Sequence, residues 1–449
     1  MDVRKSAMTA PAGTLRMLKN AVINPGGEIE KRQAFVFFAN APANSVGLMR
    51  MGDFLWAVGA GGTTVAPTPT TVGYWPLQGL PGGVTPVELL DYTQFGTKLY
   101  TVTLGSDGIV YHHYDTIYVP SGKGTAVVTI NKKIYSVDGQ YVRACALNNP
   151  QDWAGTGAWV NDLSAADAEM LDCRGLEVYY DKLAVLSQRA AQIWTVKSDT
   201  NENQLVQTLR QAGAVAPKSI RQYGSGDILY LSQDGVRSLK AREQTITASV
   251  SDIGSPMDPY VLTLANTVGV TTMAKATALL EPTNGRYWFV TEDQIMVLSN
   301  YPNPKIAAWS VFEPGFDVTD AATAGPWIYL RDRTNKVWRY GGGLATPIYD
   351  SAEADVIMPF LSFDKPATFK QFTGVDAAVT GTWQLAAGFN PANEAAEDNL
   401  GTVTGPTFLE GQFAMMGHST HCSLRFRTTA STRCVLSSVM IHYQETTTG

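Results

Sequence analysis

The sequence contains few charged residues: Asp, Glu, Lys and Arg make up 16% of its 449 residues, against roughly 25% in an average soluble protein. A surface so poor in charge suggests that neighbouring molecules cover much of it. Basic residues are not in excess either, because the net charge is −6. Binding to a phosphate backbone needs clustered Lys and Arg, so sequence-specific nucleic-acid binding is not expected. The composition is compatible with an acidic surface along which DNA can slide.

Cysteines and long apolar runs are also scarce. Cys145, Cys173, Cys422 and Cys434 are too few for a disulfide framework, and no two of them form a C-x-x-C pair. We interpret them as buried thiols of a protein in a reducing compartment. No stretch reaches 18 apolar residues, and the first twenty residues lack the apolar core of a signal peptide. We therefore expect a soluble chain that neither inserts into a membrane nor leaves the cell by the general secretory route.

Common catalytic signatures are missing as well. The sequence has no G-x-S-x-G, no H-E-x-x-H and no Walker loop. His112 and His113 fall inside one strand pattern, where they would face opposite ways, and no carboxylate lies at catalytic spacing. We interpret both as strand residues. The sequence therefore indicates no catalytic residue and no cofactor, and we expect that the protein is not an enzyme.

What the sequence does contain is a repeat of an apolar run, a polar turn and a second apolar run. Val, Ile, Leu, Tyr and Trp fill the runs and Gly, Asp, Asn and Ser the turns, which is typical of β-hairpins. Successive copies start 35, 49, 45, 59 and 41 residues apart, which brackets the roughly 40 to 50 residues of a four-stranded propeller blade. The copies begin at Lys98, Lys133, Lys182, Asp227, Arg286 and Trp327.

These hairpins predict an all-β fold in which residues 33–343 form a β-propeller and each hairpin is the middle of one blade. The runs 33–40 and 46–60 could supply another blade or the strand that closes the ring. Residues 59–71, rich in Gly, Thr and Pro, are expected to form an exposed tip. Short helices are expected in only two insertions, 155–172, with Ser164 as N-cap, and 243–280. The tryptophans near the hairpins are interpreted as blade-packing residues.

The repeat stops at 340–347, where a glycine run before Pro347 predicts a hinge. Beyond it, short alternating strands predict a β-sandwich-like platform domain over 344–449, with an acidic loop at 391–400 and a frayed tail. Residues 1–32 are expected to form an arm that joins the propeller or the platform.

A metal site in the platform is the competing interpretation of five side chains with suitable ligand chemistry. Because the flanking residues alternate like a strand, His421 and Cys422 should point to opposite faces, so ordinary strand residues are the preferred interpretation. No metal ligand is therefore assigned. The five residues are His418, His421, Cys422, Cys434 and His442.

The stretch 15–35, "LRMLKNAVINPGGEIEKRQAF", resembles the opening of the nozzle, or tail tubular protein B, family of short-tailed bacteriophages. Members typically have an asparagine, a glycine-rich turn and a Lys-Arg pair. Here these match Asn20, Gly26-Gly27 and Lys31-Arg32, although Gln33 stands where the family usually has proline. Residues 141–153 resemble a family strand that ends in Asn-Pro-x-x-Trp, which places Trp153 in the pattern.

The resemblance implies a structural protein of the virion tail, assembled in the cytoplasm of the host bacterium. It implies a homohexameric ring below the portal and adaptor proteins, which extends and gates the DNA ejection channel and contacts tail fibres or a needle. Phage DNA would pass through the lumen without sequence recognition.

Two other classes of function stay open. One is a propeller glycosidase or depolymerase associated with the tail, which would have converging carboxylates at the propeller's centre. The turns "GSDG" (105–108) and "SQDG" (232–235) are similar to sialidase Asp-boxes but lack their spacing and terminal Trp. The other is a solitary sugar-binding or scaffold propeller, which would be a monomer.

Overall fold

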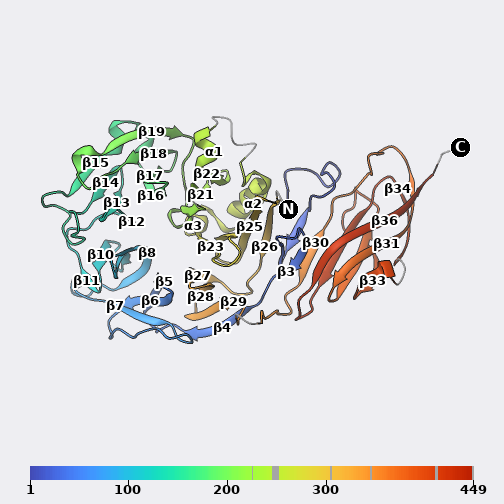
Figure 1. The fold of residues 1–449 in the computed structure, drawn as a ribbon, viewed down its shortest axis with the longest axis horizontal. Coiled ribbons are helices and arrows are strands. Elements are labelled where there is room, and N and C mark those ends of the chain that lie inside the picture. Colours follow the sequence, from blue (N-terminus) through green and yellow to red (C-terminus); the bar gives the residue numbers. More distant parts are fainter. Residues whose placement is uncertain (225, 245–251, 304–305, 344–345, 410–412, 447–449) are drawn as a thin grey trace.

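Sheets of three or four mostly antiparallel strands follow one another along most of the chain. The computed structural model describes residues 1–449 except 225, 245–251, 304–305, 344–345, 410–412 and 447–449. In the described residues, seven successive sheets lie between Phe35 and Tyr340. The first strand of each sheet contacts the first strand of the next sheet. The first strand of the seventh sheet contacts the first strand of the first sheet, so the ring is closed. The predicted β-propeller is thus confirmed, and we call the sheets blades 1 to 7 (Figure 1).

Each of the six predicted hairpins lies in its own blade as two adjacent, antiparallel strands, as the repeat predicted. Blade 1 has three strands in place of the expected four, and blade 5 has three strands among the described residues. Blade 1 contains β5 (Ser45–Met51), β6 (Phe54–Ala60) and β7 (Gly73–Leu77); blade 2 contains β8 (Pro86–Phe95), β9 (Lys98–Gly105), β10 (Val110–Tyr114) and β11 (Ile117–Tyr118); blade 3 contains β12 (Ala126–Ile130), β13 (Lys133–Asp138), β14 (Tyr141–Ala144) and β15 (Trp159–Asp162).

The turns explain why these strands pair locally. Asn131 and Lys132, between β12 and β13, have φ of 50° and 59°, which is the two-residue type I′ geometry that matches strand twist.

The remaining blades follow the same order. Blade 4 contains β16 (Cys173–Tyr179), β17 (Lys182–Ser187), β18 (Ala190–Thr195) and β19 (Gln204–Arg210); blade 5 contains β20 (Arg221–Tyr223), β21 (Asp227–Ser232) and β22 (Gly235–Ser238); blade 6 contains β23 (Thr277–Leu280), β24 (Tyr287–Val290), β25 (Ile295–Tyr301) and β26 (Ile306–Phe312).

Blade 7 closes the ring with a strand from the other end of the propeller sequence. Its strands β27 (Val318–Ala324), β28 (Trp327–Asp332) and β29 (Lys336–Tyr340) are completed by β4 (Phe35–Asn40), which pairs antiparallel with β29. Both uses suggested for the early runs therefore occur, because 33–40 closes the ring and 46–60 forms blade 1. Of the exposed tip expected at 59–71, residues 61–71 form a loop that is almost entirely exposed, whereas Gly59 and Ala60 belong to β6.

Helices occupy one insertion, between blades 5 and 6. They are α1 (Leu239–Gln244), α2 (Asp258–Val268) and α3 (Val270–Met273), and residues 245–251 of the predicted segment lie outside the described residues. The other insertion with expected short helices, 155–172, contains β15 and two 3-10 helices, Leu163–Ala165 and Ala168–Met170. Ser164 as N-cap was wrong: the N-caps are Asp162 and Asp167, because these carboxylates accept the free backbone N–H groups. No helix in the described part of the chain is long and apolar enough to cross a membrane.

The C-terminal strands form two sheets that enclose an apolar core. One sheet has the order β30-β35-β32-β33 and the other β3-β36-β31-β34. The acidic loop expected at 391–400 ends earlier, since a strand begins at residue 398. We call these two layers the platform: β30 (Ala354–Ile357), β31 (Lys370–Thr380), β32 (Trp383–Gly388), β33 (Asp398–Val403), β34 (Phe413–Ser419), β35 (Ser423–Thr428) and β36 (Val435–Glu445).

The N-terminal arm joins the propeller to the platform. β1 (Met17–Lys19) pairs parallel with β26 of blade 6 and antiparallel with β30, so blade 6 and one platform layer form a continuous nine-stranded sheet. The hairpin β2 (Ala21–Ile23) and β3 (Ile29–Lys31) extends the other layer through β36. One apolar core runs from the helical insertion through blade 6 into the platform.

Candidate functional site: an axial pocket and a buried joint

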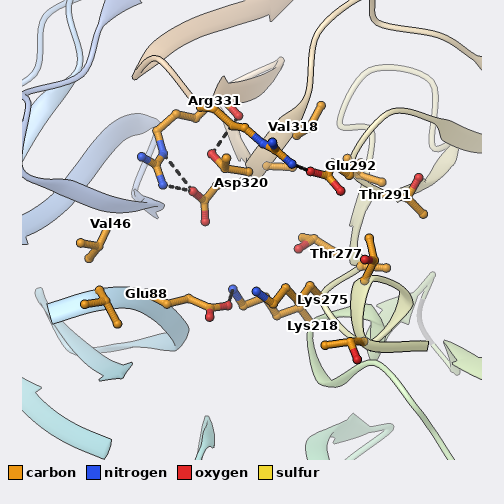
Figure 2. A pocket seen from close by; sticks show the side chains of 18 residues that line it. Val46, Glu88, Lys218, Lys275, Thr277, Thr291, Glu292, Val318, Asp320 and Arg331 are labelled. Carbon is orange, nitrogen blue, oxygen red and sulfur yellow. Dashed lines mark hydrogen bonds and ion pairs between the residues drawn. The ribbon is translucent and has the colours of Figure 1, made fainter. Parts of the chain in front are cut away.

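A cavity of about 400 Å³ opens at the centre of the ring (Figure 2). The innermost strands β5, β8, β23 and β27 contribute to its walls, together with the segments around Lys218, Thr271 and Arg333. We call it the axial pocket. Four basic and three acidic side chains line it, namely Lys218, Lys275, Arg331, Arg333, Glu88, Glu292 and Asp320.

One wall carries two lysines and one carboxylate. Lys218 Nζ lies 3.2 Å from Glu88 Oε1. In Figure 2 the side chains of Lys218 and Lys275 both extend toward Glu88. Lys275 makes no ion pair within the described residues. This wall therefore carries two ammonium groups and a single carboxylate.

The facing wall is electrically balanced. Arg331 Nε donates to Asp320 Oδ2 at 2.9 Å, and its Nη1 donates to the backbone oxygen of Ser45 at 3.0 Å. Arg333 pairs with Glu292 and also lies 3.4 Å from Asp317 Oδ2. Each basic group here faces a carboxylate, so this wall contributes hydrogen-bonding groups with little net charge.

Deeper along the axis, three ionisable side chains from the innermost strands of blades 2, 4 and 5 meet. Burial raises the pKa of Asp91 and of Glu177, while the Arg221 guanidinium acts in the opposite direction on both. Asp91 also accepts hydrogen bonds from the backbone N–H groups of Tyr92 and Val127, at 2.9 Å each. These groups tie neighbouring blades together across the centre.

The pocket's carboxylates do not have the arrangement that glycoside hydrolysis requires. That reaction uses one protonated carboxylic acid and one free carboxylate. Glu88, Glu292 and Asp320 each lie in an ion pair with Lys or Arg. The pocket is better suited to holding a polar, charged molecule than to proton transfer. Sequence patterns did not indicate these residues, because they come from different blades: Glu88 from β8, Asp320 from β27 and Glu292 from the turn after β24.

The second site is a buried joint between arm, propeller and platform, and Asn20 is at its centre. Asn20 has φ of 49° and is 2% exposed. Its Oδ1 accepts from Arg32 Nε and from the backbone N–H of Glu313, both at 2.9 Å, and its Nδ2 donates to the backbone oxygen of Glu353 at 2.8 Å. One side chain thus connects the end of blade 6 with the start of the platform.

The Lys-Arg pair completes this joint. Lys31 Nζ donates to the backbone oxygens of Asp350 and Ala430 at 2.8 and 2.7 Å, and burial lowers the pKa of Lys31. Arg32 Nη1 donates to Asp350 Oδ2 at 2.8 Å, and its Nη2 donates to the Glu313 backbone oxygen at 3.1 Å. Apart from Asn20 and Gln33, the hydrogen-bond partners of these cations belong to the propeller's end or to the platform side.

The other positions of the sequence pattern lie elsewhere. Gly26 and Gly27 form the turn of the β2–β3 hairpin, where Gly27 has φ of 82°. Trp153 lies in the propeller against Tyr100 and His112, and its Nε1 donates to the Pro150 backbone oxygen at 3.0 Å. The backbone N–H of Gln33 donates to Tyr340 Oη at 3.2 Å, a bond that proline could not make.

The five platform residues considered as metal ligands are dispersed. His418 stacks on Phe369, His442 Nε2 lies 2.9 Å from Asp376 Oδ2, and Cys422 and Cys434 are buried in the core. His421 contacts Thr420 Oγ1 at 2.8 Å. Among the residues with described positions, no three His, Cys, Asp or Glu side chains gather as metal ligands would.

The adjacent histidines in blade 2 are both fully buried in strand β10. His112 Nδ1 lies 3.0 Å from Tyr100 Oη and its Nε2 lies 2.9 Å from the Gly124 backbone oxygen. Burial lowers the pKa of each histidine to about 4. Both lie away from the axial pocket lining.

The described residues 340–347 form a turn that is tied to the arm. The Gly341 backbone N–H donates to the Ala34 oxygen at 2.8 Å, and the Ile348 N–H donates to the Gly341 oxygen at 3.0 Å. Residues 344–345 of the predicted hinge lie outside the described residues.

Comparison with solved structures returns propellers at low identity. No protein-family model matches the sequence, and no curated protein matches it. The β-propeller domain of Cps50 (Swd1) from Myceliophteria thermophila is 12% identical with a TM-score of 0.43, covering 69% of this chain and 99% of that one. BamB from Moraxella catarrhalis is 10% identical with a TM-score of 0.36, over 68% and 83% of the two chains. The computationally designed Ika8 protein is 10% identical with a TM-score of 0.35, over 69% and 97%. In fold, the protein is a β-propeller with an added two-layered β platform.

Proposed function

We propose that this chain is a structural protein of a short-tailed phage virion, a tail nozzle whose copies form a ring below the portal and adaptor. In this role the ring extends the DNA channel and closes it until ejection. The work is mechanical, so the chain needs stiffness, surfaces for self-association and a lumen that does not hold DNA.

One observation carries the proposal: Asn20, Lys31 and Arg32, three residues of the nozzle-like sequence pattern, meet in the buried joint. Their charged hydrogen bonds link the end of blade 6 to the platform. Such bonds are roughly twice as strong as neutral ones. A joint of this kind transmits force between two bodies without a loose hinge, which suits a component of a tail.

The outer platform surface supports self-association. On β34 and β36 the residues Met415, Val439 and Ile441 face the core, so Met416 and Met440 face outward. Met416 is 90% exposed and Met440 is 52% exposed. The two methionines lie on strands separated by β31, and exposed apolar side chains on the outer face of a sheet suit a surface that a partner covers. We assign that partner as a second copy of this chain.

The net charge of −6 supports the passage of DNA. Clustered Lys or Arg on a channel wall would bind phosphates strongly, whereas an acidic or neutral wall repels them or leaves them mobile.

Light scattering tests the proposal, with the protein measured alone and after mixing with the adaptor protein of the same phage. The expected result is a closed ring of several copies on the adaptor, even if the free chain is monomeric. A chain that stays strictly monomeric and never joins the adaptor ring would overturn the proposal.

A propeller glycosidase or depolymerase is the second candidate, and the central position of Glu88, Glu292 and Asp320 is the observation in its favour. Incubation with host polysaccharide, followed by measurement of released reducing sugar, separates it from the nozzle. Sugar release that is lost in Glu88→Gln would favour the enzyme. A solitary scaffold or sugar-binding propeller would show neither ring formation nor sugar release.

A further inference from the structure

The axial pocket has a wall whose hydrogen-bonding groups are left without partners. The hydroxyls of Thr271, Thr272 and Thr277 make no hydrogen bond within the described residues, and neither does the Lys275 ammonium. All four lie within residues 271–277, where the helical insertion leads into blade 6. Three free hydroxyls and one free cation therefore face a single cavity.

The backbone holds these groups in place. The Lys275 N–H donates to the Thr272 oxygen at 3.1 Å, and the N–H groups of Ala274 and Ala276 donate to Val270 and Met273 at 2.9 and 3.1 Å. Met273 and Ala276 are buried. Because residues on both sides of Lys275 are anchored in the core, its side chain is directed toward the pocket without a rearrangement.

Lys218 is anchored in a similar way. The neighbouring Ser219 is buried; its Oγ donates to the Ala216 oxygen at 2.6 Å and accepts from the Leu231 N–H at 2.9 Å, while its backbone oxygen accepts from Tyr287 Oη at 3.0 Å. The backbone around both lysines is thus held by the core, so that binding has to order only their side chains.

The charge balance defines the kind of ligand. Four basic and three acidic side chains line the pocket, and the unbalanced positive charge is on the wall where Lys218 pairs with Glu88 and Lys275 has no ion-pair partner among the described residues. That wall attracts one negative charge. The adjoining hydroxyls, with the carboxylates of the facing wall, can exchange hydrogen bonds with a ligand that carries several hydroxyls. The volume of about 400 Å³ is within the range of small-molecule sites.

We propose that the axial pocket binds a small hydroxylated anion, that is, a sugar carrying one carboxylate or phosphate group. The anionic group lies between Lys218 and Lys275, and the sugar hydroxyls face Thr271, Thr272 and Thr277. Binding is non-covalent and is independent of ring assembly, so failure of this inference leaves the proposed nozzle untouched.

Titration calorimetry on the full chain tests the inference with four probes: glucuronate, glucose 6-phosphate, glucose and inorganic phosphate. Glucuronate represents an acidic polysaccharide unit and glucose 6-phosphate a phosphorylated sugar, so their relative affinities identify the source. We expect at least one of these two to bind more tightly than both glucose and inorganic phosphate, and its affinity to fall as salt is added. Equal binding of glucose, equal binding of inorganic phosphate, or no binding of either sugar anion would overturn the inference.

Three variants locate the binding. Lys275→Gln removes the free cation and should weaken the anion's affinity by about tenfold, as for loss of a hydrogen bond to a charged group. Lys123→Gln, at an exposed lysine outside the pocket, should leave the affinity unchanged. Glu88→Gln removes the competing carboxylate and should tighten binding, a gain that misfolding cannot produce. Unchanged affinity in Lys275→Gln, or weaker binding in Glu88→Gln, would contradict the assignment.

Discussion

His113 is a buried residue with no hydrogen-bond partner for either ring nitrogen among the described residues. Its strand neighbour His112 is equally buried but contacts Tyr100 and Gly124. Two adjacent histidines therefore differ in what a substitution removes. His113 contributes packing alone, against Tyr118 at a ring separation of 6.0 Å, whereas His112 also provides hydrogen bonds.

His113→Leu should reduce the acid sensitivity of the protein. Burial lowers the pKa of His113 from 6.5 to about 4, so between these values only the unfolded chain takes up the proton. Stability is thus unaffected above about pH 7 and falls as the pH drops from 6.5 toward 4. Leucine does not take up a proton, so the variant avoids this loss. Between pH 7.5 and 4.5 its free energy of unfolding should fall by about 2 kcal/mol less than that of the wild type.

The measurement is the free energy of unfolding in urea at both pH values. His418→Leu is the matched control, because His418 is exposed on β34. Parallel pH dependence in the wild type and in His113→Leu would show that burial of this imidazole does not control acid stability.

At the scale of elements, ring closure depends on one strand that is distant in sequence from its blade. β4 completes blade 7 and places Phe35 against Trp288, Phe316 and Tyr340, with ring centroids 6.3, 6.0 and 5.4 Å apart. The packing joins blades 6 and 7. Phe37, two residues further along the same face, lies at the edge of this cluster: it is 47% exposed and packs against Trp338 with ring centroids 6.0 Å apart.

Phe35→Ala should open this closure. Replacing a buried phenylalanine by alanine costs about 3 to 5 kcal/mol. We expect faster amide hydrogen exchange in β29 and β4, and a smaller change in blades 3 and 4 on the far part of the ring. Phe37→Ala, at the half-exposed edge of the same cluster, removes less buried surface and should cost less, about 1 kcal/mol. Uniform exchange across all blades in Phe35→Ala would indicate that the ring unfolds as one unit.

At the scale of the whole molecule, propeller and platform are joined twice: β1 connects their sheets, and Asn20, Lys31 and Arg32 fill the joint. Assembly is then decided by the surfaces that remain outside. The outward face of β34 and β36 offers low charge and two exposed methionines.

Met416→Lys should abolish association between copies if rings form through this face. A lysine at a buried contact would bring an unpaired charge into an apolar interface. Light scattering with the adaptor should then report monomers, while the melting temperature of the free chain stays unchanged. Val206→Lys, at a 50% exposed position on β19 of blade 4, is the control and should still assemble. Rings formed equally well by Met416→Lys would place the interface elsewhere.

The sequence by itself determined the hairpins, because strand pairing across a short turn depends on neighbouring residues: alternating apolar positions and turn residues such as Asn131 predict it directly. It also indicated the propeller, through the spacing of the repeats, and the separate set of strands after residue 343.

Only the tertiary structure decided which early run closes blade 7, how the arm joins both bodies, and which side chains meet. Lys275, Lys218 and Glu88 converge because the ring brings blades 2, 5 and 6 to one axis. Arg32, Glu313 and Asp350 converge because β1 passes between two sheets. Contacts between residues so far apart in the sequence form only when the whole fold closes. For this reason they leave no local pattern in the sequence.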